Sequence, residues 1–465
     1  MQRRTPLSFR EYLSSLKGKR VAVVGAGISN SPLIEALLSA SIETTVYDKR
    51  TRSEMDGAAA RFESLGAELR LGADYLCGLE ADVIFRTPGL MPANPDLFEA
   101  VKRGATLTSE IEAFFDVCPC KIIAVTGSDG KTTTTSIIAD ILKREGKAVH
   151  VGGNIGKPLL CEADAMRPDD IAVLELSSFQ LITMKRSPDI AVVTNVEPNH
   201  LDVHSGMDEY IGAKRNIFIH QKRADRAVFN FDNDTARDFA DSAPGEVLFF
   251  SRRERVGNGV RLEEGDILEA INGRSELIMR ADEIFLPGAH NIENFMAAFA
   301  AVRDLAGRET MAETARTFPG VAHRIEFVRE LRGARYYNDS IASSPTRTIA
   351  GLRAFDQKVI LIAGGKDKGI PFDGLGLEIV KHVKALVLTG PTSGAIRASV
   401  EKAPGFSGAP DIVICEDFTD AVLSAAGLAQ AGDVVLLSPA CTSFDRFKNF
   451  EERGELFREI VEGLS

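Results

Sequence analysis

The sequence predicts an α/β fold built on parallel sheets, and two patterns carry that prediction. Short apolar, β-branched runs recur along the chain, each ends abruptly in small or polar residues, and helical patterns lie between them. Continuous apolar strands are buried on both faces, as in parallel sheets that helices cover. The runs lie at residues 21–27, 82–89, 122–130, 171–178, 190–196, 359–365, 385–390 and 433–440.

The 465 residues predict three such domains, because a domain typically holds about 100–150 residues. We expect a Rossmann-like domain at 1–109, a central phosphate-loop ATPase-type domain at 110–320 and a second Rossmann-like domain at 321–465. Residues 245–288 partly alternate hydrophobic and polar side chains around glycine-containing turns, which predicts a small antiparallel insert in the central sheet.

Composition excludes several classes of protein. The 55 Lys and Arg residues against 66 Asp and Glu give a net charge of −11, and no Lys/Arg-rich run is present, so nucleic acid is not an expected partner. No secretory h-region and no run of about 20 apolar residues appears, which predicts a cytoplasmic protein without a membrane partner, expected to act as a monomer. The sparse cysteines are expected to be reduced packing residues: Cys77, Cys118, Cys120, Cys161, Cys415 and Cys441.

The segment TGSDGKTT (126–133) follows a predicted strand and opens a predicted helix that ends near Gly146. Glycines turn backbone N–H groups toward a polyphosphate, a lysine meets its β/γ oxygens, and the next hydroxyl can ligate Mg²⁺. The predicted ATP-binding residues here are Gly127, Ser128, Asp129, Gly130, Lys131, Thr132 and Thr133. Val125 stands where the common motif has glycine, so the loop is a shortened variant. The alternatives are GTP as the nucleotide, or a glycine-rich turn with a solvated lysine.

Glu175 and His200 follow two further strands of the same predicted domain and should reach the same sheet edge. A carboxylate and an imidazole near a triphosphate suit cation binding, although a lone Glu at a strand end is more often only solvated. His200 and His204 have the spacing of a zinc pair, but the glutamate that follows the first histidine in zincins is missing.

The first predicted strand leads into Gly25-Ala26-Gly27, and Asp48 ends the next strand, as in a dinucleotide-binding turn. Asn30 replaces the third glycine of that fingerprint. A diphosphate-bearing ligand at this helix start, with Ser29, Lys49 and Arg50 beside it, is therefore the narrower prediction, and NAD is the alternative.

Several short motifs resemble those of the Mur ligases, the ATP-dependent amino-acid ligases of peptidoglycan synthesis, in the same order along the chain. They are TGSDGKTTT, GGNIG (152–156), ELSSFQ (175–180), NVEPNHLD (195–202), YIGAK (210–214), GAHNIEN (288–294), HR (323–324), NDS (338–340) and SPACTSFDRFKNFEERG (438–454). ELSSFQ and the last motif most resemble the member that adds glutamate to UDP-N-acetylmuramoyl-L-alanine. The D-N-P-R motif usual in the diaminopimelate- or lysine-adding member is absent.

This resemblance implies a peptide-forming ligase with Mg²⁺ as cofactor and with ATP, glutamate and UDP-N-acetylmuramoyl-L-alanine as substrates. The carboxylate of the sugar peptide would first become an acyl phosphate, which the amine of glutamate, expected as the D-enantiomer, would then attack. The implied catalytic residues are Lys131, His200 and Lys214, the last as a carbamate formed from CO₂. The implied metal ligands are Thr132, Glu175, His200 and the Lys214 carbamate.

The resemblance also assigns residues to each substrate. Further ATP contacts would be Asn291, Asn294, Arg324 and Asp339. The UDP-sugar would meet Ile28, Ser29, Lys49, Arg50, Thr87, Pro88, Gly89, Asn154, Ser177 and His200. Glutamate would meet Lys368, Ser443 and Phe450.

One departure affects the amino-acid pocket. The glutamate-adding enzymes commonly read Asp-Ser-Lys-Ala-Thr, whereas Ile341 follows Asp339-Ser340 here, so Lys368 or Arg347 would supply the cation that a dicarboxylate needs. L-glutamate or another amino acid therefore stays an alternative substrate. Outside these ligases, the alternatives are a regulatory or motor ATPase, an NAD-dependent oxidoreductase and a non-enzymatic binding protein. Folylpolyglutamate synthetase is a related ligase that also adds glutamate, but it lacks a uracil-nucleotide domain of the kind that residues 1–109 suggest.

Overall fold

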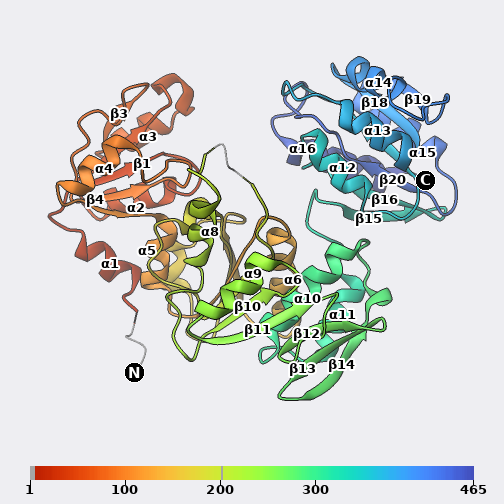
Figure 1. Cartoon of the computed structure of the whole chain (residues 1–465). Coiled ribbons are helices and arrows are strands. Elements are labelled where there is room, and N and C mark those ends of the chain that lie inside the picture. Colours follow the sequence, from red (N-terminus) through yellow and green to blue (C-terminus); the bar gives the residue numbers. More distant parts are fainter. Residues whose placement is uncertain (1–5, 200–202) are drawn as a thin grey trace. The chain divides into compact units, whose positions relative to one another are not determined.

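The computed structural model describes residues 6–199 and 203–465, and within these ranges the strands form three sheets with helices packed on them (Figure 1). The α/β prediction is confirmed: each of the eight apolar runs contains a strand. The chain divides into two compact units, Met1–Glu283 with Glu293–Thr314, and Ile284–Ile292 with Ala315–Ser465. The expected domain boundaries near residues 110 and 320 stay a prediction.

The N-terminal sheet is entirely parallel, with strand order β3-β2-β1-β4-β5. Its strands are β1 (Val21–Val24), β2 (Thr44–Asp48), β3 (Glu68–Leu71), β4 (Val83–Arg86) and β5 (Thr106–Thr108). Its helices are α1 (Phe9–Ser15), α2 (Ser31–Ser39), α3 (Ala58–Ser64) and α4 (Pro95–Lys102), with the short η1 (Arg52–Met55). Strand order reverses between β1 and β4, and ligands of such sheets bind beyond the strand ends at that point.

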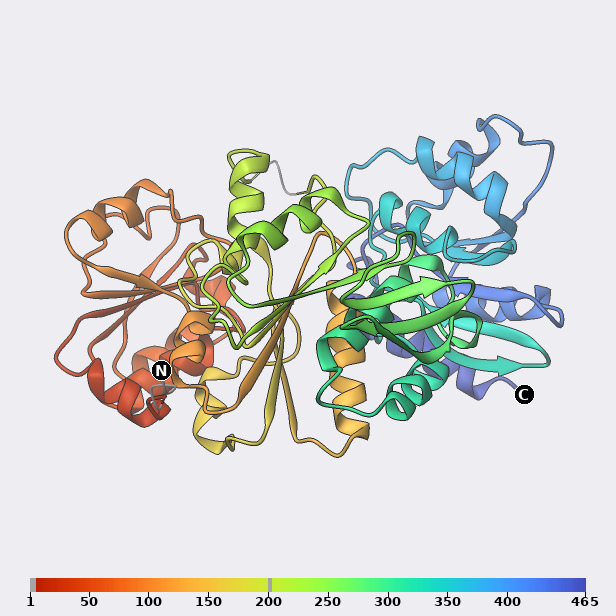
Figure 2. The same cartoon turned by 60° about the horizontal axis from the view of Figure 1, so that its bottom comes forward.

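The central sheet has the order β14-β13-β12-β11-β10-β9-β6-β8-β7 and is parallel from β7 to β12. Its strands are β6 (Lys121–Thr126), β7 (Val149–Gly153), β8 (Ile171–Glu175), β9 (Ile190–Val193), β10 (Arg226–Asn230), β11 (Glu246–Ser251), β12 (Gly259–Glu263), β13 (Asp266–Ile271) and β14 (Arg274–Arg280). Only β12–β13–β14 pair antiparallel, the green strands at the far end of this sheet in Figure 2. The expected insert at 245–288 was therefore too long, because β11 joins the parallel part through β10.

Helices surround this sheet and link it to the next. They are α5 (Glu110–Val117), α6 (Lys131–Arg144), α7 (Ser178–Leu181), α8 (Met207–Arg215), α9 (Asp234–Asp238), α10 (Ala289–Val302) and α11 (Arg308–Thr317), with the 3-10 turns η2 (Leu160–Ala165), η3 (Phe239–Ser242) and η4 (Ala281–Glu283). Helix α6 ends as predicted: Gly146 has φ +80°, and the N–H groups of Gly146 and Lys147 donate to the carbonyls of Lys143 and Leu142.

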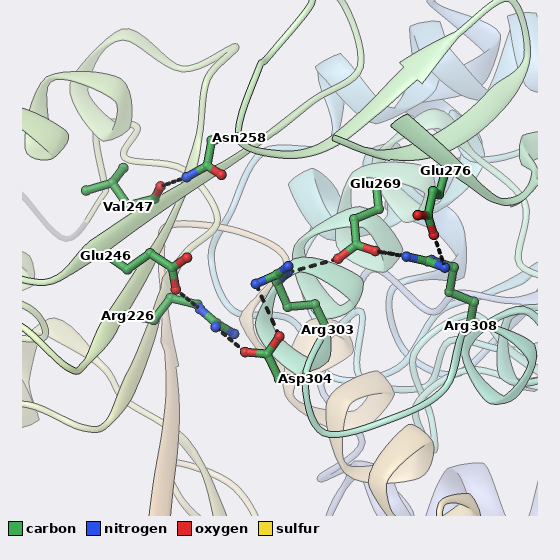
Figure 3. Close-up of polar contacts among 9 residues, drawn as sticks. All are labelled: Arg226, Glu246, Val247, Asn258, Glu269, Glu276, Arg303, Asp304 and Arg308. Carbon is green, nitrogen blue, oxygen red and sulfur yellow. Dashed lines mark hydrogen bonds and ion pairs between the residues drawn. The ribbon is translucent and has the colours of Figure 1, made fainter. Parts of the chain in front are cut away.

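An ion-pair network attaches the antiparallel insert to the rest of its unit (Figure 3). Glu269 of β13 accepts from Arg303, just after α10, at 2.9 Å and from Arg308 of α11 at 2.6 Å. Arg303 also contacts Asp304, which pairs with Arg226 of β10. The Glu269 side chain is only 11% exposed, so these pairs are screened by solvent less than ordinary surface pairs.

The C-terminal sheet has the order β15-β16-β20-β17-β18-β19 and is parallel apart from the β15–β16 hairpin. Its strands are β15 (Glu326–Leu331), β16 (Ala334–Asn338), β17 (Val359–Ala363), β18 (Val383–Thr389), β19 (Asp411–Cys415) and β20 (Val434–Leu437). Its helices are α12 (Pro345–Leu352), α13 (Asp373–His382), α14 (Ser393–Glu401), α15 (Phe418–Leu428) and α16 (Phe450–Gly463). The central strands β16, β20 and β17 end at one edge, where the polar segments follow.

Among the described residues, no helix is both long enough and apolar enough to cross a bilayer. Of the cysteines, Cys118, Cys120 and Cys441 are buried, and Cys161 and Cys415 are half-buried. Cys77 is exposed, so the expectation that it packs in a core was wrong.

Candidate active site

The phosphate loop (residues 126–133) connects β6 to α6 and depends on its glycines. Gly130 has φ +78°, and a Cβ there would lie 2.4 Å from Oδ1 of Asn294. A Cβ on Gly127 would lie 1.9 Å from the Thr194 hydroxyl. Only glycine fits either position without displacing a neighbour. The loop therefore lies directly against Thr194, just beyond β9, and Asn294 of α10.

Donors of this loop are held by groups of the protein itself. The backbone N–H groups of Ser128 and Asp129 donate to Oδ1 of Asn195 at 3.1 and 2.9 Å. Lys131 Nζ donates to the carbonyls of Gly127 and Ser128, each at 2.9 Å. The loop thus has the shape of an anion site, but the hydrogen-bond donors named here are bonded to other atoms of the protein. A bound polyphosphate would have to replace these internal bonds.

Glu175, at the end of β8, contacts two of the other predicted residues. Its Oε2 accepts from the Thr132 hydroxyl at 2.7 Å, and its Oε1 accepts from Nδ2 of Asn154 at 2.8 Å. The carboxylate is only 2% exposed. It therefore lies between the first turn of α6 and the loop that follows β7, at the edge of the sheet where the sequence placed it.

Oxygen atoms are the ligands that Mg²⁺ prefers, and Thr132 and Glu175 offer a hydroxyl and a carboxylate beside the phosphate loop. Outside residues 1–5 and 200–202, no cluster of three or more His, Cys, Asp or Glu side chains could hold a metal on its own. Mg²⁺ commonly takes one or two carboxylates together with water and substrate phosphates, so this set fits that ion. His200 lies outside the described residues.

Lys214 of α8 is buried against the same loop. Its Nζ donates to the Gly127 carbonyl at 2.7 Å and lies 4.6 Å from the centre of the Tyr210 ring. Burial lowers the pKa of Lys214 well below its ordinary value, and the positive charge of Lys131 lowers it further. The uncharged amine is the reactive form of lysine, so the site favours a nucleophilic amine here. Lysine side chains are mostly exposed in folded proteins, whereas Lys214 is only 1% exposed.

Three further side chains hold this region together, and of these only Tyr210 was given no role by the sequence analysis. Tyr210 shares a hydrogen bond of 3.0 Å with the Ser128 hydroxyl, and Ser177 caps α7 by accepting from Gln180 N. His204 is buried between Ser178 Oγ (2.9 Å) and the Glu209 carboxylate (3.0 Å). Both nitrogens of His204 are thus engaged by the protein, which leaves the zinc-pair alternative without its second ligand.

The predicted UDP-binding residues gather beyond β1, β2 and β4 of the N-terminal sheet. Asp48 accepts from Ala26 N at 2.8 Å and from Arg50 Nε and Nη2 at 3.0 and 2.8 Å. A Cβ on Gly25 would lie 2.8 Å from that of Thr87. Because Arg50 covers the Asp48 carboxylate, that acid is not free to meet a ribose, as the NAD alternative requires. Of the other members of the set, Ser29 and Pro88 are half-buried, and Ile28, Lys49 and Gly89 are exposed.

Arg86 is a further residue that the sequence analysis missed. It ends β4, is 1% exposed, and donates to the carbonyls of Pro88, Leu90 and Phe179 at 3.2, 2.9 and 2.8 Å. It thereby ties the Thr87–Gly89 turn to α7. An arginine at the end of an apolar strand carries no sequence signal of such a role, because most of its partners are backbone carbonyls and its one side-chain partner, Thr183, is far away in the sequence.

The C-terminal sheet gathers a second set at the ends of β16, β20 and β17. Asp339 is buried and accepts from the Ser438 hydroxyl at 2.7 Å. Burial raises the pKa of Asp339 to about 7, although the Ser438 bond and the charge of Arg324 lower it. Lys368 Nζ donates to the Ser343 hydroxyl at 3.2 Å, and Ser443 is 2% exposed.

Arg453 of α16 links these strand ends. Its guanidinium donates to Ser340 Oγ and to the carbonyls of Ser340 and Cys441, and the Ser340 hydroxyl donates to the Phe450 carbonyl at 2.8 Å. Asn291 belongs to the same unit, where its amide donates to Pro287 O at 2.7 Å. The substrate roles of all these residues stay predictions.

Comparison with known proteins gives the family. Residues 125–302 match the model of the Mur ligase middle domain, and residues 323–441 match that of the Mur ligase glutamate ligase domain. A UDP-N-acetylmuramoylalanine–D-glutamate ligase from Acetivibrio thermocellus is 50% identical over 98% of this chain and 98% of its own length. The chain belongs to the Mur ligase family. Another such ligase, from Ruminiclostridium cellulolyticum, is 48% identical over 98% of both chains.

Solved structures of Mur ligases share the fold at low sequence identity. The UDP-N-acetylmuramate-alanine ligase of Thermotoga maritima aligns over 96% of this chain and 99% of its own, with a TM-score of 0.58 and 17% identity. A UDP-N-acetylmuramoyl-L-alanyl-D-glutamate–2,6-diaminopimelate ligase aligns over 99% and 100%, with a TM-score of 0.57 and 16% identity. These structures show the shared fold, and the 50% identity over 98% of the chain to the Acetivibrio thermocellus ligase confirms the sequence-based family resemblance.

Proposed function

We propose that this Mur ligase joins D-glutamate to UDP-N-acetylmuramoyl-L-alanine in peptidoglycan precursor synthesis, with ATP converted to ADP and phosphate. The observation that carries this proposal is the 50% identity over 98% of both chains to a relative named for that reaction. Because ATP is an intracellular metabolite, we place the reaction in the cytoplasm, and we expect a monomer.

The phosphate loop supports the first step. An amide does not form from a carboxylate and an amine in water without an energy source. In the proposed step, the terminal carboxylate of the alanyl group attacks the γ-phosphorus of ATP. The bond between the γ-phosphorus and the β-phosphate oxygen breaks, ADP departs, and the alanyl carboxylate becomes an acyl phosphate. Lys131, at the start of α6 and within reach of the loop carbonyls, would place its charge on the transferred phosphoryl group. The amine of glutamate then attacks the acyl carbon, loses a proton and expels phosphate.

Mg²⁺ would neutralise charge that builds up on the phosphates, with Thr132 and Glu175 holding it. We assign His200 to the same ion and to the substrate. Lys214 is proposed to add CO₂ through its uncharged amine: an N–C bond forms, the amine loses a proton, and a carbamate anion results. Burial of Lys214 beside Lys131 supports this assignment, because an adjacent cation would stabilise the new negative charge.

The remaining substrates are assigned by the turns at the strand ends. The turns that carry Ser29, Arg50 and Thr87 would bind the uridine diphosphate. Lys368 lies on the hydroxyl of Ser343, so it would supply a cation for a glutamate carboxylate where Ile341 cannot. Asn294, against the phosphate loop, and Asn291, Arg324 and Asp339 would contact ATP.

The test is a ligation assay with ATP, UDP-N-acetylmuramoyl-L-alanine and a panel of D- and L-amino acids, read as phosphate release and as product mass. We expect release only with D-glutamate and the UDP-sugar together. Lys131→Ala should lower ligation by about 10³-fold or more, because the lost charge acts mainly in the transition state. Lys143→Ala, an exposed lysine on the same helix, is the matched control and should stay near the parent rate.

Two results would overturn the proposal. Phosphate release that is independent of both acceptors would indicate a regulatory ATPase. Product formation with L-glutamate or another amino acid in place of D-glutamate would keep the ligase but reject the assigned substrate.

A further inference from the structure

A pair of thiols lies at the start of the central sheet. Cys118 follows α5, and Cys120 precedes β6, with Pro119 between them. Their Sγ atoms are 3.5 Å apart, and the Cys118 thiol also donates to the Cys120 carbonyl at 3.6 Å. The two residues are two positions apart, so their Cα atoms are within about 7 Å, close to the span that a disulfide bridges. The sulfur atoms are thus already in contact.

The pair lines a cavity of about 670 Å³. The same cavity is lined by side chains of both charges, the cations being Lys185, Arg186 and Lys222 and the anions Asp116, Asp189 and Asp225. Cys118 is 8% exposed and Cys120 is 2% exposed. A small oxidant would therefore reach the thiols through the cavity rather than from the outer surface. None of the residues assigned to the ligase reaction lies in this cavity lining.

The two sulfurs are chemically unequal. Cys120 Sγ shares a hydrogen bond with the Cys118 sulfur and accepts one from the backbone N–H of Ala172, and these bonds lower the pKa of Cys120 against the opposing effect of burial. Cys118 lies at the C-terminal end of α5, where the partial negative charge of the helix disfavours a thiolate. The arrangement makes Cys120 the better nucleophile and Cys118 its resolving partner.

We propose that Cys118 and Cys120 form a redox-active dithiol that a peroxide converts into an intrachain disulfide. The Cys120 thiolate attacks one peroxide oxygen and the O–O bond breaks. Hydroxide departs, and Cys120 is then a sulfenic acid. Cys118 sulfur then attacks the sulfenic sulfur, the S–O bond breaks, and the hydroxyl leaves as water with the Cys118 proton. In sum, two thiols and one hydrogen peroxide give one disulfide and two waters.

Peptide mass spectrometry tests this on the wild-type protein. Trypsin cleavage after Arg103 and after Lys121 releases residues 104–121, which contain Cys118 and Cys120 and no other cysteine. The folded protein is treated with hydrogen peroxide and then denatured in iodoacetamide, which alkylates free thiols. We expect this peptide to carry no alkyl label and to be lighter than the unlabelled dithiol peptide by two hydrogen atoms. Treatment with a dithiol reductant before labelling should restore two labels.

Single substitutions assign the roles. Cys118→Ser should leave a sulfenic acid on Cys120 that dimedone traps, whereas Cys120→Ser should leave Cys118 unreactive toward peroxide. Cys77→Ser removes an exposed thiol elsewhere and should not change the 104–121 peptide. Full double labelling of that peptide in peroxide-treated wild-type protein, under conditions that oxidise Cys77, would overturn the proposal and return both thiols to a packing role.

Discussion

The buried guanidinium of Arg86 allows a quantitative test of how the unit that holds the phosphate loop is assembled. Arg86→Met keeps an unbranched apolar stem but removes the charge and its donors. The shortest bonds run to Leu90 O at 2.9 Å and Phe179 O at 2.8 Å. A hydrogen bond to a charged group contributes about 1.5–3 kcal/mol, so losing both removes about 3–6 kcal/mol.

Two effects change this gross figure. Burial disfavours the charged guanidinium and lowers the pKa of Arg86. Because methionine carries no charge, the variant avoids this desolvation cost, which offsets part of the lost hydrogen-bond energy. Nε of Arg86 also finds no acceptor among the described residues, so its removal costs no hydrogen bond. We expect a net destabilisation of about 2–4 kcal/mol, or about 3–6 °C in the melting temperature of the affected unit.

Differential scanning calorimetry measures the melting temperature, and hydrogen exchange locates the change. We expect faster exchange at residues 87–90 and 179–183, on either side of the lost bonds. Arg103→Met is the matched control: that arginine is exposed and its side chain donates to Leu79 O at 2.7 Å, so the substitution should cost less than about 1 kcal/mol. Equal melting temperatures for the two variants would refute the reasoning.

Three further predictions concern buried charge. Lys214→Ala should abolish most ligation and recover part of it when short carboxylates are added; no loss, or no recovery, counts against a carbamate. Burial raises the pKa of Glu110 to about 7 from 4.5, so its favourable contribution to folding, present below about pH 4.5, is lost as the pH rises through about 7. Glu110→Gln should therefore melt at an increasingly higher temperature than the parent between about pH 5 and pH 8 in calorimetry, and a constant difference would contradict this. Glu269→Gln should destabilise the insert by about 1–2 kcal/mol in low salt, with a smaller effect in high salt; exchange in β13 and β14 measures it.

The sequence by itself determined the α/β class, the buried strands and the family. Apolar runs that end in small polar residues are a local signal, because a strand buried on both faces cannot carry charge along its length. The phosphate loop was equally local: Gly127, Gly130 and Lys131 must be close in sequence to act on one phosphate group. Glu175 could be placed at the edge that carries the phosphate loop because parallel strands end together, whereas Asn154 was assigned only through the family resemblance.

Only the tertiary structure decided which groups are buried and what they contact. Lys214 has the sequence pattern of a surface lysine, yet α8 buries it against Gly127, and that burial together with the charge of Lys131 lowers its pKa. Arg86 binds backbone carbonyls, which every residue carries, so no pattern of side chains announces its partners. The 3.5 Å contact between Cys118 and Cys120 likewise depends on how α5 ends and β6 begins. Burial and backbone contacts are set by the whole chain, and a linear sequence records neither.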